Sequence, residues 1–339
     1  MQQDLQTRKP GAADRPYQGT SYYGRPALKA SPFGWKTSGY IFLAGMSGSA
    51  QILGTMADLF GGPGMEKTAR NARHVAMIGA TLGPMLLIGD LHTPSRWYNM
   101  LRIFRRTSPM SIGSYILSSF GAFSAVTAAA DWMGMKRTAR LTQVPAALAG
   151  AGMSVYTAAL LSSTSTPLWA AAPRLLAVRF GSSAMACGAA ALSLGERFDG
   201  RPGNAERLDR IAMVASAVDL AASLASNREY EAHHVAEPIE HGALGVVDKI
   251  GAIAVGAAIP LVCHAVNAGR RRPSAALSVL GSLAILAGGM ALRTAILRAG
   301  NRSAERPTDY FRFAQKPPST LNERKRAPLP NGQARRALP

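Results

Sequence analysis

The sequence predicts an all-α polytopic membrane protein whose eight transmembrane helices pack as bundles. Eight runs of roughly 20 mostly apolar residues follow one another along the 339-residue chain, and a helix needs about 20 such residues to cross a bilayer. Charged residues make up only 17% of the chain and hydrophobic residues 47%, whereas about 25% of the residues of a typical soluble domain are charged. The runs lack the period-two alternation of barrel strands, so the predicted spans are helices.

The eight spans are separated by short polar loops. The spans are rich in small residues, such as Gly79 and Gly83 in the second span and Gly150 and Gly152 in the fourth. Residues of this size allow helices to approach one another closely in a membrane. The expected limits of the spans, in chain order, are 38–60, 75–91, 111–131, 143–166, 171–195, 208–227, 243–267 and 275–297.

The four tryptophans fall at the ends of predicted spans. They are Trp35, Trp97, Trp132 and Trp169. Tryptophan is enriched where a membrane meets water, because its ring is apolar and its N–H is polar. We therefore expect all four to form an interfacial aromatic belt.

The net charge of +19 does not indicate a nucleic-acid-binding protein. Residues 1–36 hold six basic and two acidic residues, and residues 298–339 hold ten basic and three acidic ones, so the ends carry +4 and +7. The other basic residues lie between apolar runs, not on one face with stacking aromatics. We divide the chain into a basic N-terminal tail (1–36), an eight-helix membrane domain (37–298) and a basic, disordered C-terminal tail (299–339).

An even number of spans places both termini on one side of the membrane, here called side A. The loops on the opposite side, side B, carry 13 Lys and Arg, against 6 in the side-A loops. Loops rich in Lys and Arg stay in the cytoplasm, although the basic tails favour the reverse orientation. We expect a multi-pass protein of the bacterial cytoplasmic (inner) membrane with its termini on the periplasmic side.

Ionisable side chains inside the spans concentrate in the side-A half. A charge within a span is costly, so it marks either a functional site or a buried ion pair. Both interpretations stay open for this group, which would form a buried charge network or only fix helix packing. The group comprises Asp90, Tyr156, Asp219, Asp248, Lys249 and Arg293, with Arg174 and Arg179 entering from the same side.

The six histidines do not predict a haem site. Ligation by two histidines needs both to face inward at matching depth, and only His74 and His264 are placed for it. There is no Cys-x-x-Cys-His motif, and Cys187 and Cys263 are too few to hold an iron–sulfur cluster. We expect no haem, iron–sulfur cluster or other metal in this chain.

The segment from Gly89 to Leu117 reads GDLHTPSRWYNMLRIFRRTSPMSIGSYIL. Pro94 and Pro109 bracket a short helix that we expect to lie at the side-A interface. Its arginines are available for lipid phosphates or for an acidic partner. These are Arg96, Arg102, Arg105 and Arg106.

This segment resembles the NrfD/PsrC family, the integral-membrane quinone-reacting subunits of polysulfide-reductase-type and nitrite-reductase-type complexes. The family pattern is Asp-Leu-x-x-Pro-x-Arg-Phe/Tyr, then Asn-Met-Leu-Arg, then Thr/Ser-Ser-Pro-Met-Ser. The resemblance covers about residues 33–305 in matching order. Three further stretches match: Tyr40-Ile-Phe-Leu-Ala-Gly45, Tyr156-Thr-Ala-Ala-Leu-Leu with Pro167-Leu-Trp169, and Gly288-Gly-Met-Ala-Leu-Arg293 with Ala299-Gly300.

The resemblance implies a subunit without a resident cofactor that oxidises or reduces a membrane quinone, for example menaquinone. Electrons would pass to or from a docked multi-cluster iron–sulfur subunit, which usually serves a molybdopterin-type catalytic subunit. The quinone pocket would lie toward the docking face among the first four helices. Tyr156 would be its tyrosine in span four, and Tyr40 and Arg96 would help to bind the quinone.

Our mechanistic hypothesis is that Tyr156 binds a quinone oxygen while Asp90 or His92 accepts a proton near side A. Asp219, Lys249 and Arg293 would tune the site or form a buried network. Arg102, Arg105 and Arg106, in the basic loop 92–110, would dock the iron–sulfur partner.

Two alternatives to quinone exchange stay open. The charges in mid-membrane suggest a secondary transporter, for which Pro84 and Pro260 are weak indications. The start of span one reads Trp35-Lys-Thr-Ser-Gly-Tyr40, with neither a carboxylate nor an imidazole. That composition suggests a structural membrane anchor whose quinone site is degenerate.

Overall fold

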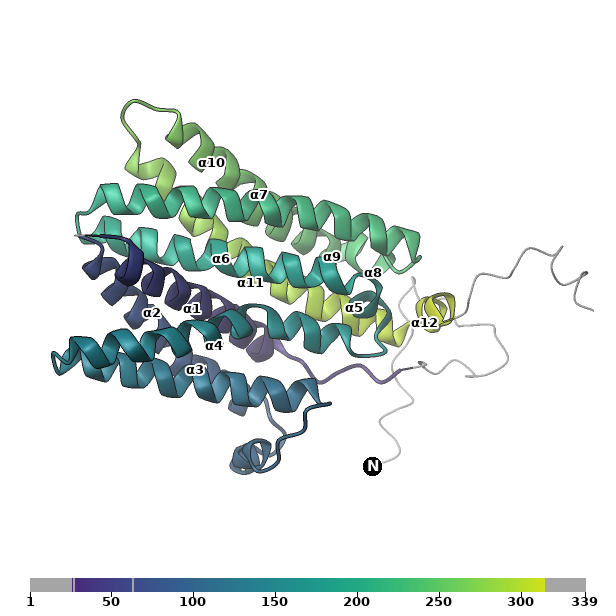
Figure 1. Cartoon of the computed structure of the whole chain (residues 1–339). Coiled ribbons are helices and arrows are strands. Elements are labelled where there is room, and N and C mark those ends of the chain that lie inside the picture. The colour runs from purple at the N-terminus through teal and green to yellow at the C-terminus, as the bar shows by residue number, and fades with distance from the viewer. Residues whose placement is uncertain (1–25, 27, 63, 315–339) are drawn as a thin grey trace, which may run out of the picture.

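The computed structural model describes residues 26, 28–62 and 64–314, and every regular element in this part of the chain is a helix (Figure 1). The long helices run side by side in one elongated bundle. The lower half of Figure 1 holds α1 (Trp35–Phe60), α2 (Glu66–Gly89), α3 (Pro109–Trp132) and α4 (Lys136–Ser162).

The second half of the chain begins with α6 (Pro173–Phe198) and α7 (Pro202–Ala232). An irregular helix follows, in which the π-helical segment η2 (Val247–Ala258) joins α9 (Gly242–Val246) to α10 (Ile259–Ala268). The last long helix is α11 (Ala275–Glu305), and α1, α6 and α11 pack against one another between the two halves.

Every predicted span lies on a helix of the structure, which confirms the all-helical membrane class. By length and hydropathy, six helices of the described chain qualify as membrane spans: α2, α3, α4, α6, the helix Gly242–Ala268 and α11. The structure thus supports six spans where the sequence predicts eight. The two others, α1 and α7, are long enough but are not among these six; α1 is rich in Gly and Ser, and α7 carries several charged residues.

Three short helices lie toward the right-hand end of the molecule in Figure 1, which is side A. They are α5 (Pro167–Ala171), α8 (Glu237–Glu240) and α12 (Pro307–Ala314). A fourth, η1 (Pro94–Leu101), lies below the bundle in this view. The segment between Pro94 and Pro109 is helical only as far as Leu101. Ser108 then caps α3, its Oγ accepting a hydrogen bond from the Ser111 backbone N–H at 3.4 Å.

Part of the predicted C-terminal tail is helical, because α11 continues to Glu305 and α12 follows it. The end of α11 is buried, and the Ser303 hydroxyl accepts a hydrogen bond from the Leu168 backbone N–H at 3.1 Å. Arg306 then pairs with Glu237 and Asp309, and its hydrogen bond lowers the pKa of the Glu237 carboxyl. Residues 1–25 and 315–339 of the predicted tails lie outside the described residues.

Three of the four tryptophans have the exposure that an aromatic belt requires. Trp35 and Trp132 are exposed at helix ends, and Trp97 is exposed on η1. Trp169 is only 1% exposed, and its indole N–H donates to the Ile296 carbonyl at 2.8 Å. The expectation was wrong for Trp169, because α5 turns inward and packs this ring against α11 at Gly300.

A pair of glycines lets α1 and α4 touch through their backbones. A Cβ atom on Gly48 would overlap the Gly150 carbonyl oxygen, and a Cβ on Gly150 would overlap that of Gly48. Close approach through small residues is a common way for membrane helices to pack. This crossing fixes the distance between the two helices that carry Tyr40 and Tyr156.

We expect Gly48→Ala to destabilise the protein by about 1–3 kcal/mol, the usual cost of overpacking a tight contact. Thermal unfolding of the purified protein in detergent measures it. Gly121→Ala is the matched control, because a Cβ at this α3 position meets no atom within 4 Å. An equal loss in both variants would contradict the role of the α1–α4 crossing.

Candidate functional site

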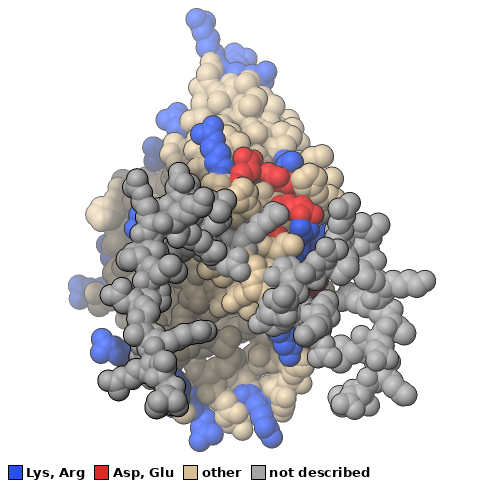
Figure 2. Space-filling model, turned by 90° about the vertical axis from the view of Figure 1, so that its right-hand side faces the viewer, with Lys and Arg blue, Asp and Glu red and all other residues tan. Residues whose placement is uncertain are grey.

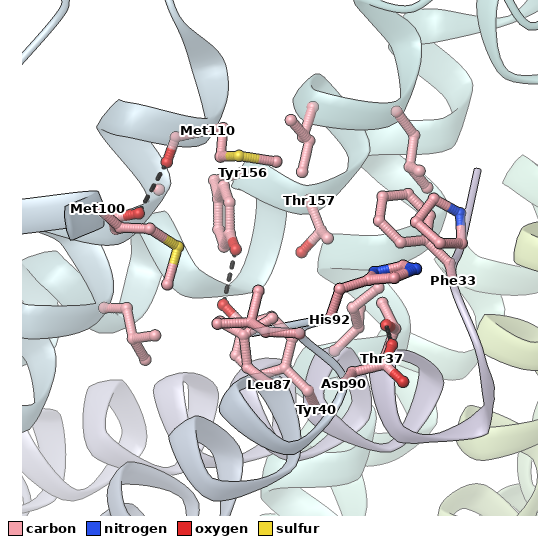
Figure 3. Close-up of a pocket in the computed structure, with 18 residues that line it drawn as sticks. Phe33, Thr37, Tyr40, Leu87, Asp90, His92, Met100, Met110, Tyr156 and Thr157 are labelled. Carbon is pink, nitrogen blue, oxygen red and sulfur yellow. Dashed lines mark hydrogen bonds between the residues drawn. The ribbon is translucent and has the colours of Figure 1, made fainter. Parts of the chain in front are cut away.

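A cavity of about 210 Å³ lies at the side-A end of the first four helices (Figure 3). Its wall is formed by the start of α1, the end of α2 with the connection that follows, the start of α3 and the end of α4. Most of the lining is apolar, including Ile41, Leu87, Met110 and Leu160. The charged, hydroxyl and imidazole side chains in the wall are Thr37, Tyr40, Asp90, His92, Ser114, Tyr156 and Thr157.

Two tyrosines form a hydrogen bond with each other in the wall of this cavity. The hydroxyls of Tyr40 on α1 and Tyr156 on α4 are 2.6 Å apart and share a hydrogen bond, drawn as a dashed line in Figure 3. Gly113 on α3 makes room for Tyr156, because a Cβ at this position would overlap the tyrosine ring. When one hydroxyl donates to the other, the second keeps its own proton. The pair therefore offers one free O–H donor to a ligand oxygen.

Asp90 ties the end of α2 to the start of α1. Its carboxylate accepts hydrogen bonds from the Thr37 hydroxyl and, at 3.5 Å, from the Gly34 backbone N–H. It thus interacts favourably with the positive end of the α1 dipole. The Lys36 ammonium donates to the Gly89 carbonyl at 2.7 Å and caps α2 in return. These contacts hold the first turn of α1, and with it Tyr40, against α2.

His92 lines the same cavity from the connection between α2 and η1 and is exposed. Figure 3 shows its ring near Phe33, Thr37 and Asp90. The first turn of α1 has no imidazole or carboxylate of its own, but the chain after α2 places both beside it. The structure thus brings four predicted site residues together: Tyr40, Tyr156, Asp90 and His92.

The four arginines of the predicted docking loop lie apart from the cavity. Arg96, expected to help bind the quinone, is exposed on η1 and does not line it. Arg102, Arg105 and Arg106 are exposed as well. Seen from side A, basic side chains lie around the edges of the molecule, the lower edge included, whereas acidic ones gather in its upper half (Figure 2). Glu229 and Glu231 near the end of α7 and Glu237 at the start of α8 are exposed.

The predicted charge network exists in part and lies between α6, α7, η2 and α11. The Arg179 guanidinium donates to the Asp248 carboxylate at 2.7 Å, and both side chains are 1% exposed. Asp219 is buried within electrostatic reach of Arg179, Asp248 and Arg293. The network therefore contains two basic residues, Arg179 and Arg293, and two acidic ones, Asp219 and Asp248.

Arg293 occupies the other end of this network. It donates to the Ser183 hydroxyl at 2.6 Å and to the Phe180 and Gly289 carbonyls, and its guanidinium lies 5.4 Å from the centre of the Phe180 ring. These contacts give both terminal nitrogens of the buried guanidinium a partner without a carboxylate in direct contact, whereas its Nε has no hydrogen-bond partner among the described residues.

Lys249 does not belong to the network. It follows Asp248 directly in η2, and neighbouring residues of a helix point in different directions, so its side chain is exposed. Arg179, and not Lys249, is the basic partner of Asp248. The signal for Arg179 was present in the sequence: a basic residue within an apolar run, on the side from which Asp248 enters the membrane.

The fold and the cavity define a multi-pass helical membrane protein with an aromatic, hydrogen-bonding pocket near one membrane face. The profile of the family described as polysulphide reductase, NrfD, matches residues 27–303, most of the chain. The chain therefore belongs to the NrfD family, whose members are integral-membrane subunits of multi-subunit respiratory oxidoreductases that react with quinones. A comparison with curated proteins gives no match.

Proposed function

We propose that this chain exchanges electrons between the quinone pool of the membrane and a docked iron–sulfur subunit, with menaquinone among the quinones it accepts. The cavity between α1 and α4 is the proposed quinone site. The observation that carries this proposal is the hydrogen-bonded pair of Tyr40 and Tyr156 in a mostly apolar cavity at the membrane face. Its volume, below the roughly 300 Å³ of pockets for drug-sized ligands, suits a quinone ring whose tail stays in the lipid.

In the proposed reaction, a quinol gives two electrons to the docked iron–sulfur subunit and releases two protons, one after the other, through the same acceptor. The free O–H of the tyrosine pair binds one ring oxygen, with Tyr156 as the contact. His92 accepts a proton and passes it to water at side A, because its side chain is both cavity-lining and exposed. Asp90 is the less direct acceptor, since Thr37 and Gly34 already donate to its carboxylate. In the reverse direction the same groups return protons to a quinone.

The proposed partner is a multi-cluster iron–sulfur subunit that serves a molybdopterin-type catalytic subunit. It would dock on side A, where the cavity lies. Arg102, Arg105 and Arg106 on one side of this face, and Glu229 and Glu231 on the other, favour a partner with the opposite arrangement of charges.

We propose that all eight long helices span the membrane, α1 and α7 included. These two helices lie side by side with the six apolar ones, and their polar groups face the protein interior, as those of Ser47, Ser49, Ser216 and Asp219 do. The proposed location is the bacterial inner membrane, with both termini outside. Protease treatment of sealed vesicles, with a tag on each end of the chain, tests this orientation; protected tags would contradict it.

The two alternative functions find less support. The anchor hypothesis rests on the polar groups missing from the start of α1, and Asp90 and His92 lie beside that turn. A transporter of this kind requires two broken helices in corresponding halves. Among the described residues, the irregular helix Gly242–Ala268 has no counterpart in the first half, where α2 is continuous through Pro84.

A fluorescent hydroxyquinoline N-oxide, an analogue of a quinol, tests the proposed site. We expect the purified full chain to bind it at a single site and Tyr40→Phe to raise the Kd about tenfold, since one hydrogen bond is worth up to about 1.5 kcal/mol. Tyr115→Phe is the control, because the Tyr115 hydroxyl donates to the Leu101 carbonyl and does not line the cavity. Unchanged binding by Tyr40→Phe and Tyr156→Phe would rule this cavity out.

A further inference from the structure

A second polar cavity, of about 260 Å³, lies at the opposite end of the molecule, on side B. It opens between the start of α7 and the turn that joins α10 to α11. Its charged and imidazole side chains come from both elements. They are Glu206, Asp209 and Arg210 on α7, His264 on α10, and Arg270 and Arg271 in the turn.

The charges of this cavity favour an anion. Asp209 is already neutralised, because its carboxylate pairs with Arg197 at 3.0 Å and accepts hydrogen bonds from Ser193 and Ser278. The remaining charges are those of three arginines and Glu206. Within the described chain, no ion pair involves Arg210, Arg270 or Arg271. An unpaired cluster of arginines is a good binding site for a phosphate group.

His264 provides a second, independent indication of a ligand. Its side chain is 1% exposed and lines the cavity, yet neither ring nitrogen has a hydrogen-bond partner among the described residues. An Asp209 carboxylate oxygen is 3.9 Å from Nδ1, which is too far for a hydrogen bond. Nε2 packs against Gly281 of α11. Buried polar groups nearly always have a partner, and a ligand oxygen in the cavity would supply one to Nδ1.

An apolar groove next to the polar cavity indicates which kind of anion would bind there. The groove, of about 840 Å³, runs along α6 and α7 and is lined by residues such as Met185, Ile211, Val214 and Val218. Arg210 lines both the groove and the polar cavity. A molecule that fills both has an anionic head and a hydrocarbon chain, whereas free phosphate fills only the cavity.

We propose that an anionic phospholipid binds at this place. Its phosphate lies among Arg210, Arg270 and Arg271 and within reach of His264, and one acyl chain follows the groove between α6 and α7. Side B carries most of the basic loops of the protein, and basic segments beside membrane helices attract anionic lipids. This site lies at the end of the molecule opposite the proposed quinone cavity, so it does not depend on the quinone assignment.

Lipid retention by the full chain tests the proposal. The protein is equilibrated in mixed micelles of phosphatidylglycerol and phosphatidylcholine, and the bound lipid is identified by native mass spectrometry. We expect the wild type to retain phosphatidylglycerol and Arg210→Gln/Arg271→Gln to reduce that preference about tenfold or more, since a hydrogen bond between charged groups contributes about tenfold. The control is Arg207→Gln/Arg272→Gln, which removes two neighbouring exposed arginines that do not line the cavity. We expect it to change the preference less than twofold.

If the two double variants lose the preference for phosphatidylglycerol equally, the proposal is wrong, because the preference then depends only on the general charge of the surface. Displacement of phosphatidylglycerol by an equal concentration of inorganic phosphate would also overturn the proposal, because it would indicate a site for the free anion. His264→Leu removes the ring donors without changing the arginines, and we expect it to weaken retention, whereas His264→Gln keeps a donor and should retain more lipid. Should a variant fail to fold, phosphatidylglycerol must still raise the Tm of the wild type more than phosphatidylcholine does; equal shifts would contradict a specific site.

Discussion

Tyr156→Phe is expected to lower quinol turnover of the assembled complex about a hundredfold while leaving assembly intact. The variant removes the hydroxyl that lies 2.6 Å from the Tyr40 hydroxyl but keeps the ring that packs over Gly113. The cavity thus keeps its shape and loses a group that binds and orients the quinone, and positioned groups of this kind typically contribute about 10²-fold or more. Turnover with a short-chain quinol in isolated membranes gives the rate.

Native electrophoresis of the same membranes shows whether the complex still forms. Tyr115→Phe serves as the control, because it removes an exposed tyrosine hydroxyl outside the cavity. Turnover of Tyr156→Phe at the wild-type rate would remove Tyr156 from the proposed role. A loss of assembly in this variant alone would instead assign Tyr156 to packing.

The second large effect is expected at the buried ion pair. Arg179→Met leaves the Asp248 carboxylate, 1% exposed, without the guanidinium that contacts it at 2.7 Å. Removing one member of a buried pair typically costs about 3–5 kcal/mol, because the other charge stays buried without a partner. We therefore expect little folded protein to be recovered from membranes, with a Tm well below that of the wild type.

The double variant Arg179→Met/Asp248→Leu is expected to recover most of this stability, since a well-packed apolar pair often replaces a buried ion pair at little cost. Arg174→Met, an exposed arginine on the same helix, is the control. The double variant also separates the two interpretations of the network. Restored stability with lost quinol turnover would assign the network to the reaction, and restoration of both would assign it to helix packing. A double variant as unstable as Arg179→Met would contradict the ion-pair explanation.

The fold was predictable because its signals are local in the sequence. Each apolar run of suitable length lies on a helix, and Pro109, predicted to bound the short helix before it, is the first residue of α3. The limits of these helices were less predictable where contacts between elements decide them. The end of α11 is an example, since burial against α5 extends it to Glu305.

Part of the candidate site was predictable for the same reason. Asp90 and His92 lie in one short motif, and an ionisable residue in an apolar run, such as Tyr156, is conspicuous. Pairings across helices were not predictable, because they depend on how each helix is rotated about its axis. The contacts of Tyr40 with Tyr156 and of Arg179 with Asp248 are of this kind.

The irregular helix Gly242–Ala268 shows most clearly what the sequence does not predict. In η2 the chain adopts π-helical turns over 12 residues, a rare form that usually occurs as a single turn. Gly256 there packs directly against Gly288 of α11. No periodicity in the sequence indicates the wider turn. Within this segment Asp248 is buried and Lys249 is exposed.

The most direct test of the central claim is to label the protein with a photoreactive quinone and to map the labelled residues by mass spectrometry. A quinone in the proposed cavity should label the first turns of α1, around Thr37 and Tyr40, and the end of α4, around Tyr156. Excess hydroxyquinoline N-oxide should abolish that labelling. Labelling confined to other surfaces, such as the groove between α6 and α7, and unchanged by the competitor, would contradict a quinone site among the first four helices.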